Sequence, residues 1–194
     1  MALVGELYLM LNRTSNLDIV RALERSGGEV VQGTFGDWLH FVDWSRRRQA
    51  LHSRRYRDFL GALASDAYQR FVERRFAGAL RGALRRPPEA SVARAVARLR
   101  GLWEPALGTE ATLTMGRILD VGRHGLSGIV NVLPFSCMPG NVVVCLGPRL
   151  RERLHGIPWL DVAFDGQRGT NLRTRLEAFL HQAFQYHRRV VPSA

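Results

Sequence analysis

The residue of this sequence best placed to do chemistry is a cysteine that follows an apolar run. Cys137 stands in Gly128-Ile-Val-Asn-Val-Leu-Pro-Phe-Ser-Cys-Met-Pro-Gly140, between Pro134 and Pro139. The β-branched run at 129–133 predicts a strand covered on both faces, and Pro134, which lacks a backbone donor, predicts its end. The thiol then lies at the carboxyl end of a strand, where open α/β sheets bind ligands. This favours a metal ligand or a reactive thiol, the alternative being a packed, small hydrophobic side chain.

Three further polar residues lie at positions suited to binding a ligand. Asp165, in Asp165-Gly166-Gln167, follows the last predicted strand and so shares the carboxyl edge of the sheet with Cys137. Arg13 follows the first predicted strand and would offer a cation beside a helix N-terminus to an anion, with ordinary capping as the alternative for its segment. Arg175 lies at the start of the last predicted helix and is less easily explained by capping than Thr174 and Glu177, which have capping-box spacing. We expect these residues to bind a cofactor.

The elements that must position these residues alternate between strands and helices. We expect strands over 2–11, 29–32, 129–133 and 159–164, and helices over 16–26, from 109 to about 119, over 141–154 and from 172 to about 184. Gly147-Pro148 should split the third of these helices. A strand, helix, strand order predicts parallel neighbours. The sequence therefore predicts a single α/β domain over 1–194, a doubly wound flavodoxin-like or Rossmann-like sheet of about four mainly parallel strands.

A helical insertion interrupts this pattern at about 38–103. Apolar residues recur there at spacings of three and four, with arginines on the other face. They are Tyr56, Phe59, Leu60, Leu63, Ala67 and Phe71. Pro87-Pro88 should break the helix, and Val92, Val96 and Leu99 indicate a second one. We expect the insertion to lie on the rim of the sheet.

The positive charge of the chain is concentrated in this insertion. The formal net charge is +11, and all 28 basic residues are arginine. Residues 46–100 hold 15 of these arginines against four acids. Such a surface attracts nucleic acid, an acidic protein or a phosphate-bearing ligand such as coenzyme A, and the alternative is a solvated helical face. Charge alone carries no base-reading element, so nucleic acid is not the expected partner.

Cysteine usage and hydropathy indicate the compartment. Two cysteines, Cys137 and Cys145, make a disulfide framework improbable and indicate a reducing cytoplasm. The N-terminus lacks a basic leader, and no apolar run approaches the 18 residues of a membrane span. Walker, dinucleotide, nucleophile-elbow and zinc-histidine motifs do not occur. We expect a cytoplasmic protein with no membrane contact.

Four stretches of the chain resemble a known superfamily. They are Val4-Gly-Glu-Leu-Tyr, the Cys137 segment at 128–140, Ile157-Pro-Trp-Leu and Asp165-Gly-Gln-Arg-Gly-Thr-Asn-Leu-Arg-Thr-Arg-Leu-Glu-Ala-Phe-Leu180. Together they resemble the 2-hydroxyacyl-CoA dehydratase and benzoyl-CoA reductase superfamily, and more narrowly the C-terminal region of the acyl-CoA dehydratase activase-related proteins. The resemblance covers roughly residues 2–34 and 108–187.

The resemblance implies an oxygen-sensitive redox system in which a 4Fe-4S cluster receives an electron from an ATP-dependent activator. Cys137 matches the cluster cysteine of the family's Cys-Met-Pro-Gly motif. The family's other cluster cysteines lie in sequence that this chain lacks, and Cys145, outside any family motif, is interpreted as a buried helix residue. The remaining ligands must then come from another chain, a second copy or a non-protein species.

Two functions follow from these observations. The first is an iron-sulfur subunit or separated C-terminal domain that contributes one 4Fe-4S ligand for low-potential electron transfer. Its partner is expected to be a larger cluster-bearing or ATP-dependent activator subunit, or further copies in a homo-oligomer, with a CoA thioester as the small ligand. It is not expected to be an active lyase alone. The alternative is a non-catalytic interaction module with a vestigial cluster site, which binds a partner through the arginine-rich insertion.

Overall fold

A four-stranded sheet, all of it parallel, forms the centre of the computed structural model, which describes residues 1–79, 91–105, 109–166 and 171–190. The strands are β1 (Ala2–Gly5), β2 (Val31–Gln32), β3 (Ile129–Pro134) and β4 (Trp159–Phe164), in the spatial order β2-β1-β3-β4. The helices are α1 (Leu7–Leu11), α2 (Ile19–Arg25), α3 (Phe35–His52), α4 (Tyr56–Ala79), α5 (Val92–Ala97), α6 (Glu110–Val121), α7 (Met138–Arg153) and α8 (Leu172–Val190), with a short 3₁₀ turn, η2 (Gly122–His124). The predicted doubly wound α/β fold is confirmed.

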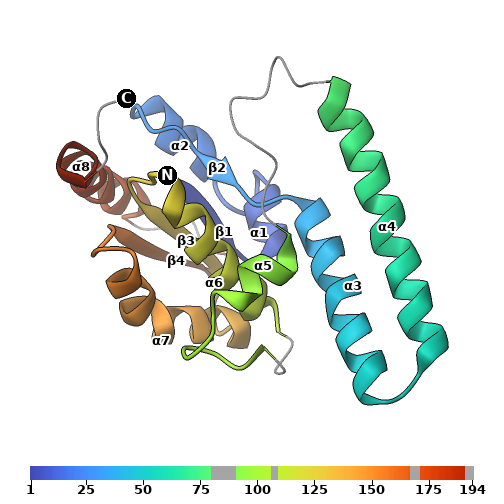
Figure 1. Cartoon of the computed structure of the whole chain (residues 1–194). Coiled ribbons are helices and arrows are strands. Elements are labelled where there is room, and N and C mark those ends of the chain that lie inside the picture. The colour runs from blue at the N-terminus through green and yellow to red at the C-terminus, as the bar shows by residue number, and fades with distance from the viewer. Residues whose placement is uncertain (80–90, 106–108, 167–170, 191–194) are drawn as a thin grey trace. The chain divides into compact units, whose positions relative to one another are not determined.

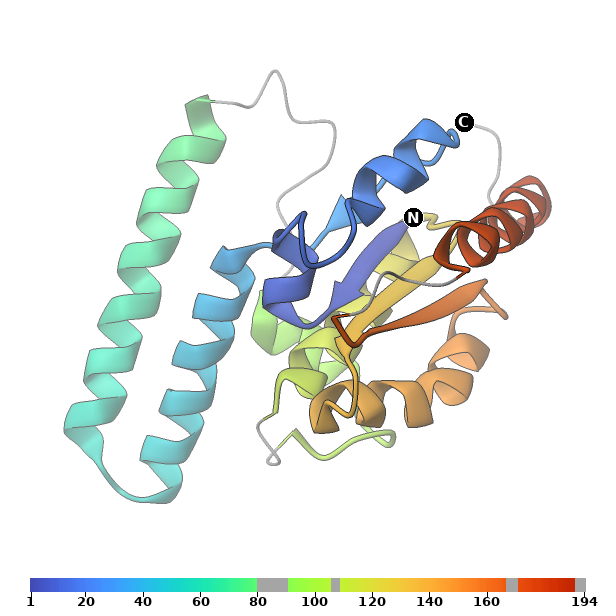
Figure 2. The same ribbon diagram turned by 180° about the vertical axis from the view of Figure 1, so that it is seen from behind.

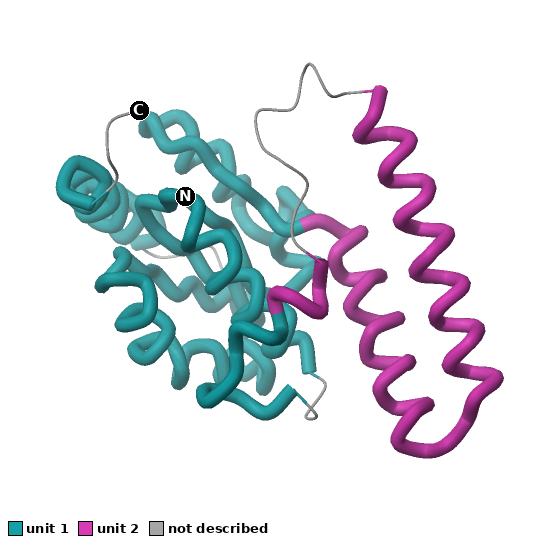
Figure 3. Tube along the Cα trace, viewed as in Figure 1, with its two compact units in different colours: residues 1–33, 96–194 teal, residues 34–95 magenta. Residues whose placement is uncertain are grey.

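The chain divides into two compact units, shown in different colours in Figure 3. Unit 1 comprises residues 1–33 and 96–194 and holds the sheet, while unit 2 comprises residues 34–95 and is helical. Helix α5 gives the helix predicted near Val92, whereas Pro87-Pro88, the predicted break, lies outside the described residues.

Helices cover both faces of the sheet in unit 1 (Figures 1 and 2). Ala2 and Val4 of β1 belong to a cluster with α6 and α7, while Leu3, between them, belongs to a second cluster with α2 and α8. This alternation follows from the two-residue period of a strand. The final helix packs as predicted, with Leu176, Phe179, Leu180 and Ala183 buried. The apolar patterns therefore place a core on each side of the sheet.

Several predicted elements differ in extent from those observed, since the strand expected over 29–32 spans Val31–Gln32 and the helix expected over 16–26 spans Ile19–Arg25; two further differences lie beside the site. The strand expected over 2–11 ends at Gly5, because the Glu6 carboxylate accepts hydrogen bonds from the backbone amides of Tyr8 and Leu9 and starts helix α1. The helix expected from 141 begins at Met138 and continues through Pro148. The proline removes one backbone hydrogen bond, but buried side chains on either side of it, Val143 and Leu150, hold both halves against the core.

Unit 2 is built around a helical hairpin whose interior is polar. Asp66 of α4 accepts hydrogen bonds from Arg47 of α3 and from Arg70, and it contacts Nδ1 of His40 at 2.8 Å. Nε2 of His40 lies 2.9 Å from a carboxylate oxygen of Glu73. His40 and Asp66 are both buried. Ion pairs and hydrogen bonds therefore join α3 to α4 where an apolar seam is usual.

The apolar stripe of α4 is consequently on its outer side. Tyr56, Leu60, Leu63, Ala67 and Phe71 are all exposed and Phe59, the sixth residue of the predicted stripe, is half-buried, whereas Ala62 and Asp66 are buried. Periodicity correctly predicts a helix here. It does not predict that the polar face would be the one turned inward, because the buried charges on that face are paired.

A candidate thiol pocket at the carboxyl edge of the sheet

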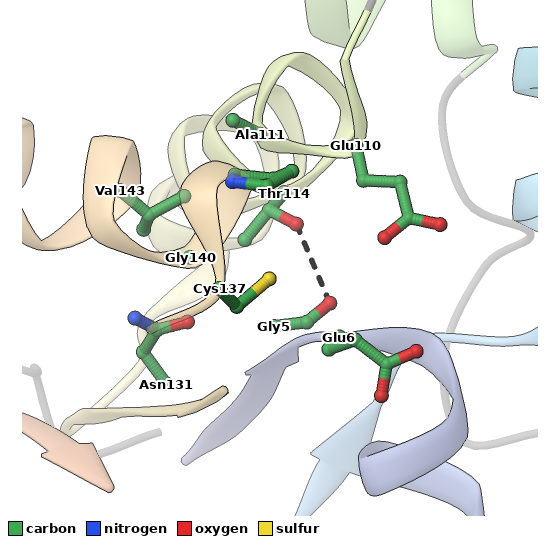
Figure 4. A pocket seen from close by; sticks show the side chains of 10 residues that line it. Gly5, Glu6, Glu110, Ala111, Thr114, Asn131, Cys137, Gly140 and Val143 are labelled. Carbon is green, nitrogen blue, oxygen red and sulfur yellow. Dashed lines mark hydrogen bonds between the residues drawn. The ribbon is translucent and has the colours of Figure 1, made fainter. Parts of the chain in front are cut away.

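The site lies where the direction of the strand order reverses. From β1 the chain proceeds to β2 on one side, and from β3 it proceeds to β4 on the other, so the carboxyl ends of β1 and β3 form a topological switch point. A small pocket of about 10 Å³, room for about one water, opens there (Figure 4). Its lining residues come from both strand ends and from the first turns of α6 and α7: Gly5, Glu6, Glu110, Ala111, Thr114, Asn131, Cys137, Pro139, Gly140 and Val143.

Cys137 occupies the N-cap position of α7, directly after the turn that ends β3. Its backbone amide donates to the carbonyl of Pro134 at 3.1 Å, and its carbonyl accepts from the amide of Asn141 at 2.9 Å. Its side chain makes no capping hydrogen bond, so the thiol is left to face the pocket (Figure 4). The thiol is partly buried beside the first backbone amides of a helix, the setting in which proteins place reactive or metal-binding thiolates.

Two glycines let the backbone elements close around this pocket. Gly5 has φ +126°, and a Cβ added to it would lie 1.9 Å from the carbonyl oxygen of Val132. A Cβ on Gly140 would lie 2.7 Å from that of Leu133. The end of β1 is thereby pressed against β3, and the first turn of α7 against the end of the same strand. Larger residues at either position would displace the elements that hold Cys137.

Asn131 is a polar residue in the middle of the buried strand β3. Its side chain is 0% exposed, and Nδ2 donates to Oδ1 of Asp161 on β4 at 2.8 Å. The same carboxylate oxygen accepts from the indole nitrogen of Trp159 at 2.9 Å. Oδ1 of Asn131 has no hydrogen-bond partner among the described residues. Figure 4 shows this oxygen on the Cys137 side and the amide nitrogen on the other.

The opposite wall of the pocket carries two acidic residues and a hydroxyl. Thr114 of α6 donates a long hydrogen bond, 3.5 Å, to the carbonyl of Gly5. Glu110 begins α6, and Glu6 caps α1. Sequence reasoning does not single out these residues or Asn131. Asn131 carries one signal in the sequence, because it is the one polar residue inside the apolar run 129–133. Glu6, Glu110 and Thr114 come from distant parts of the chain and carry no such signal.

Of the four residues predicted to bind a cofactor, Cys137 is the one that lines this pocket. Asp165 is exposed after β4, and the predicted turn continues into Gln167, which lies outside the described residues. Arg13 follows α1 and pairs with Asp18 at 3.1 Å. Arg175, on α8, donates to the carbonyl of Asp161 at 2.5 Å. The structure thus brings none of these three to the thiol.

The second cysteine occupies a different surface of α7. Cys145 is exposed, so the prediction that it is a buried helix residue is wrong. With Trp103, Met138 and Leu146 it lines a shallow groove of about 440 Å³. Its position follows from the helix period, because α7 directs Val143 and Leu150 to the core and Cys145 away from it.

The described residues contain no group of three or more His, Cys, Asp or Glu side chains placed to hold a metal ion. A 4Fe-4S cluster takes four protein ligands, usually thiolates. The pocket supplies one thiol, so the described residues do not by themselves provide the ligand set of such a cluster.

No family model, curated protein or solved structure matches this chain. Among the described residues, no helix is both long and apolar enough to cross a membrane. The interpretation of the pocket therefore depends on its own chemistry and on the sequence motifs around it.

Proposed function

We propose that the chain is an iron-sulfur component of a redox system resembling the 2-hydroxyacyl-CoA dehydratases and their activase-related proteins. In this proposal Cys137 supplies one ligand to a 4Fe-4S cluster that serves low-potential electron transfer to a CoA thioester. The observation that carries it is the position of the thiol, at a helix N-cap inside a pocket at the switch point of the sheet. The motif Pro134-Phe-Ser-Cys-Met-Pro-Gly140 supports it independently.

The remaining cluster ligands would come from a partner. The surface beside Cys137 suits such a contact, because Phe135 and Met138, which flank it, are both exposed. Exposed apolar side chains around a partly buried ligand are what a second chain would cover. The expected partner is a larger cluster-bearing or ATP-dependent activator subunit, or a further copy of this chain.

The two cysteines of α7 allow a matched test. The chain is purified without oxygen together with its natural partner, and bound iron, sulfide and the visible absorbance of the cluster are measured. Cys137→Ser should lower the iron and sulfide content and alter the absorbance, while Cys145→Ser, a control on the exposed side of the same helix, should leave all three unchanged. A complex free of iron, or one in which Cys137→Ser assembles the same cluster, would show that the proposal is wrong.

A second candidate function is based on the exposed apolar residues of helix α4. The exposed stripe of α4 favours an interaction module that binds its partner through unit 2. Tyr56, Leu60 and Phe71 are 67%, 62% and 58% exposed. Exposed apolar residues arranged along one helix face mark a docking surface more often than a free one.

Charge indicates what kind of partner this stripe would bind. Arg57 and Arg74 are exposed on α4 and form no ion pair with an acid among the described residues, and Arg75 lies 5.8 Å above the ring of Phe71. An apolar stripe bordered by arginines complements a partner with an apolar groove and an acidic rim. In this second proposal the partner is therefore an acidic protein surface.

The two candidates differ in which surface the partner needs. Recovery of the natural partner with the tagged chain is measured for Leu60→Ser/Phe71→Ser and for Cys137→Ser. The interaction module predicts that the double variant loses the partner while Cys137→Ser keeps it, and that wild-type binding weakens as salt rises. An unchanged recovery with the double variant would exclude unit 2 as the docking surface. Gly61→Ser, on the exposed surface of the same helix, serves as control.

A further inference from the structure

The sheet of unit 1 has one long open edge, the outer side of β4. This strand comes last in the strand order, and no described segment pairs with its far side. The strand at the opposite edge, β2, is two residues long, and so short a strand offers little for another chain to pair with. β4 has six residues, and none of them is a proline or a basic residue, the types that often keep an edge strand from pairing. Protection of this edge must therefore come from elsewhere in the chain.

The hydrogen bonds to β3 show which backbone groups of β4 face outward. The amide of Ile129 donates to the carbonyl of Pro158, the residue before its register neighbour Trp159. In a parallel pair this pattern directs every second residue toward the partner strand, so the amides and carbonyls of Trp159, Asp161 and Ala163 point away from β3. These outward groups form the β4 edge, and they are what a further strand would bind.

The single charge within β4 is turned away from this edge. The carboxylate of Asp161 accepts from Nδ2 of Asn131, on the neighbouring strand β3, at 2.8 Å. The same oxygen accepts from the indole nitrogen of Trp159 at 2.9 Å. Because both bonds hold the carboxylate on the β3 side, it does not stand in the way of a strand that approaches from outside.

Arg175 of α8 occupies the β4 edge. Its guanidinium donates to the backbone carbonyl of Asp161, the central residue of the edge, at 2.5 Å. The arginine lies in the first turn of α8, where a positive charge opposes the helix dipole, so helix stability does not explain its position. Arg173, two residues earlier, pairs with Glu177 at 2.9 Å, whereas Arg175 forms no ion pair with an acid among the described residues.

We propose that Arg175 blocks the β4 edge, and that a second copy of this chain is the partner it keeps away. An approaching strand would have to displace the hydrogen bond to Asp161 and bury the guanidinium, which costs free energy. A second copy offers the same open edge, and two such edges can pair antiparallel across a two-fold axis. The inference does not depend on the iron-sulfur proposal, because Arg175 and the β4 edge lie outside the lining of the thiol pocket.

Removing the guanidinium tests this proposal on the full-length chain. Sedimentation equilibrium over a range of concentrations measures the self-association of wild type, Arg175→Ala and Arg173→Ala. One charge-assisted hydrogen bond that no longer has to be broken favours pairing by about tenfold per chain, so Arg175→Ala should self-associate about 100-fold more strongly than wild type. Arg173→Ala, whose side chain is 93% exposed and pairs within α8, should self-associate as wild type does.

Amide hydrogen exchange locates the contact. In Arg175→Ala the outward amides of Asp161 and Ala163 should become protected as the concentration rises, while the amide of Val162, which faces β3, should not change. Ala163→Pro, added to Arg175→Ala, removes one outward amide without breaking a hydrogen bond to β3. Self-association of this double variant should return to the wild-type value.

Equal self-association of Arg175→Ala and wild type would overturn the proposal. Association that leaves the amides of Asp161 and Ala163 unprotected, or that persists after Ala163→Pro, would overturn it as well, because the contact would then lie elsewhere. Arg175 is exposed, so its replacement should leave the fold intact. If Arg175→Ala does not fold, Arg175→Met, which keeps most of the side-chain length without a donor, provides the same comparison.

Discussion

Replacing Asp66 with asparagine should loosen the α3–α4 hairpin more than any other single change of charge in unit 2. Its carboxylate accepts from Arg47 at 3.1 Å and from Arg70 at 3.0 and 3.2 Å, and it lies 2.8 Å from His40. Removing one partner of a buried ion pair costs about 3–5 kcal/mol. Because the side chains of Arg47 and Arg70 are 21% and 35% exposed, water relieves part of this cost, and we expect about 3 kcal/mol.

Native-state hydrogen exchange measures this effect within the hairpin itself. Amides of α3 and α4 that exchange by opening of the hairpin should lose about 150-fold in protection, the equivalent of about 3 kcal/mol. The control is Asp58→Asn on the same helix, whose ion pair with Arg55 is solvent-exposed and should change protection less than twofold. If the two variants lose the same protection, the polar interior is not what holds the helices together.

The same carboxylate should make the hairpin sensitive to acid. Burial opposes ionisation of Asp66, but hydrogen bonds from Arg70 and His40 and the charges of Arg47 and Arg70 outweigh it, so the pKa lies below its usual value. Its stabilisation is therefore complete above about pH 4, where an unfolded aspartate is ionised, and is lost as the pH falls through the folded pKa. Protection in Asp66→Asn should decline less over this acid range, and a parallel decline in both proteins would contradict the assignment.

Changes at Gly5 and Tyr186 test unit 1, and a change at Gly61 in unit 2 provides a comparison. Gly5→Ala should prevent stable folding, because its Cβ would lie 1.9 Å from the carbonyl oxygen of Val132. Gly61→Ala, in exposed α4, would place its Cβ in open space and should stabilise that helix by up to about 1 kcal/mol. Circular dichroism on heating measures both effects. Burial raises the pKa of Tyr186, which donates to the Leu154 carbonyl at 2.9 Å, so its ionisation, followed by ultraviolet absorbance, should need a more alkaline pH than a free tyrosine. The stabilisation from the neutral Tyr186 side chain is present below about pH 10 and is lost as the pH rises through the raised pKa. Tyr186→Phe should lower the free energy of unfolding by about 1 kcal/mol. Ionisation of Tyr186 at the pH of a free tyrosine would contradict its burial.

Local patterns account for most of the sheet. The run 129–133 predicts a strand covered on both faces, and β3 ends at Pro134 because proline has no amide to continue the ladder. The strand at 159–164 is confirmed as a short, mostly apolar run, and the stripe of α8 is confirmed because its apolar residues recur at helical spacing. The N-terminal strand is shorter than predicted because Glu6, a residue compatible with a strand, uses its carboxylate to cap a helix.

The candidate site was predictable only in part. Cys137 could be found because a thiol after a buried strand belongs at the edge of an α/β sheet. The acceptor of Asn131 could not be found, because nothing in the sequence shows that Asp161 takes up its other end. Arg13, Asp165 and Arg175 follow the predicted elements, but the structure gives them other surroundings.

The amino-acid sequence by itself determined the order of the strands, most of the helices and the place of Cys137, because periodicity, proline and capping act between near neighbours in the chain. Only the tertiary structure decided which face of α4 is turned to solvent, since a helical period defines two faces without saying which one finds partners. It alone brought Gly5, Thr114 and Asn131 to the thiol. Those residues meet because parallel strands distant in sequence pair edge to edge, and such pairing is encoded in no single stretch of the chain.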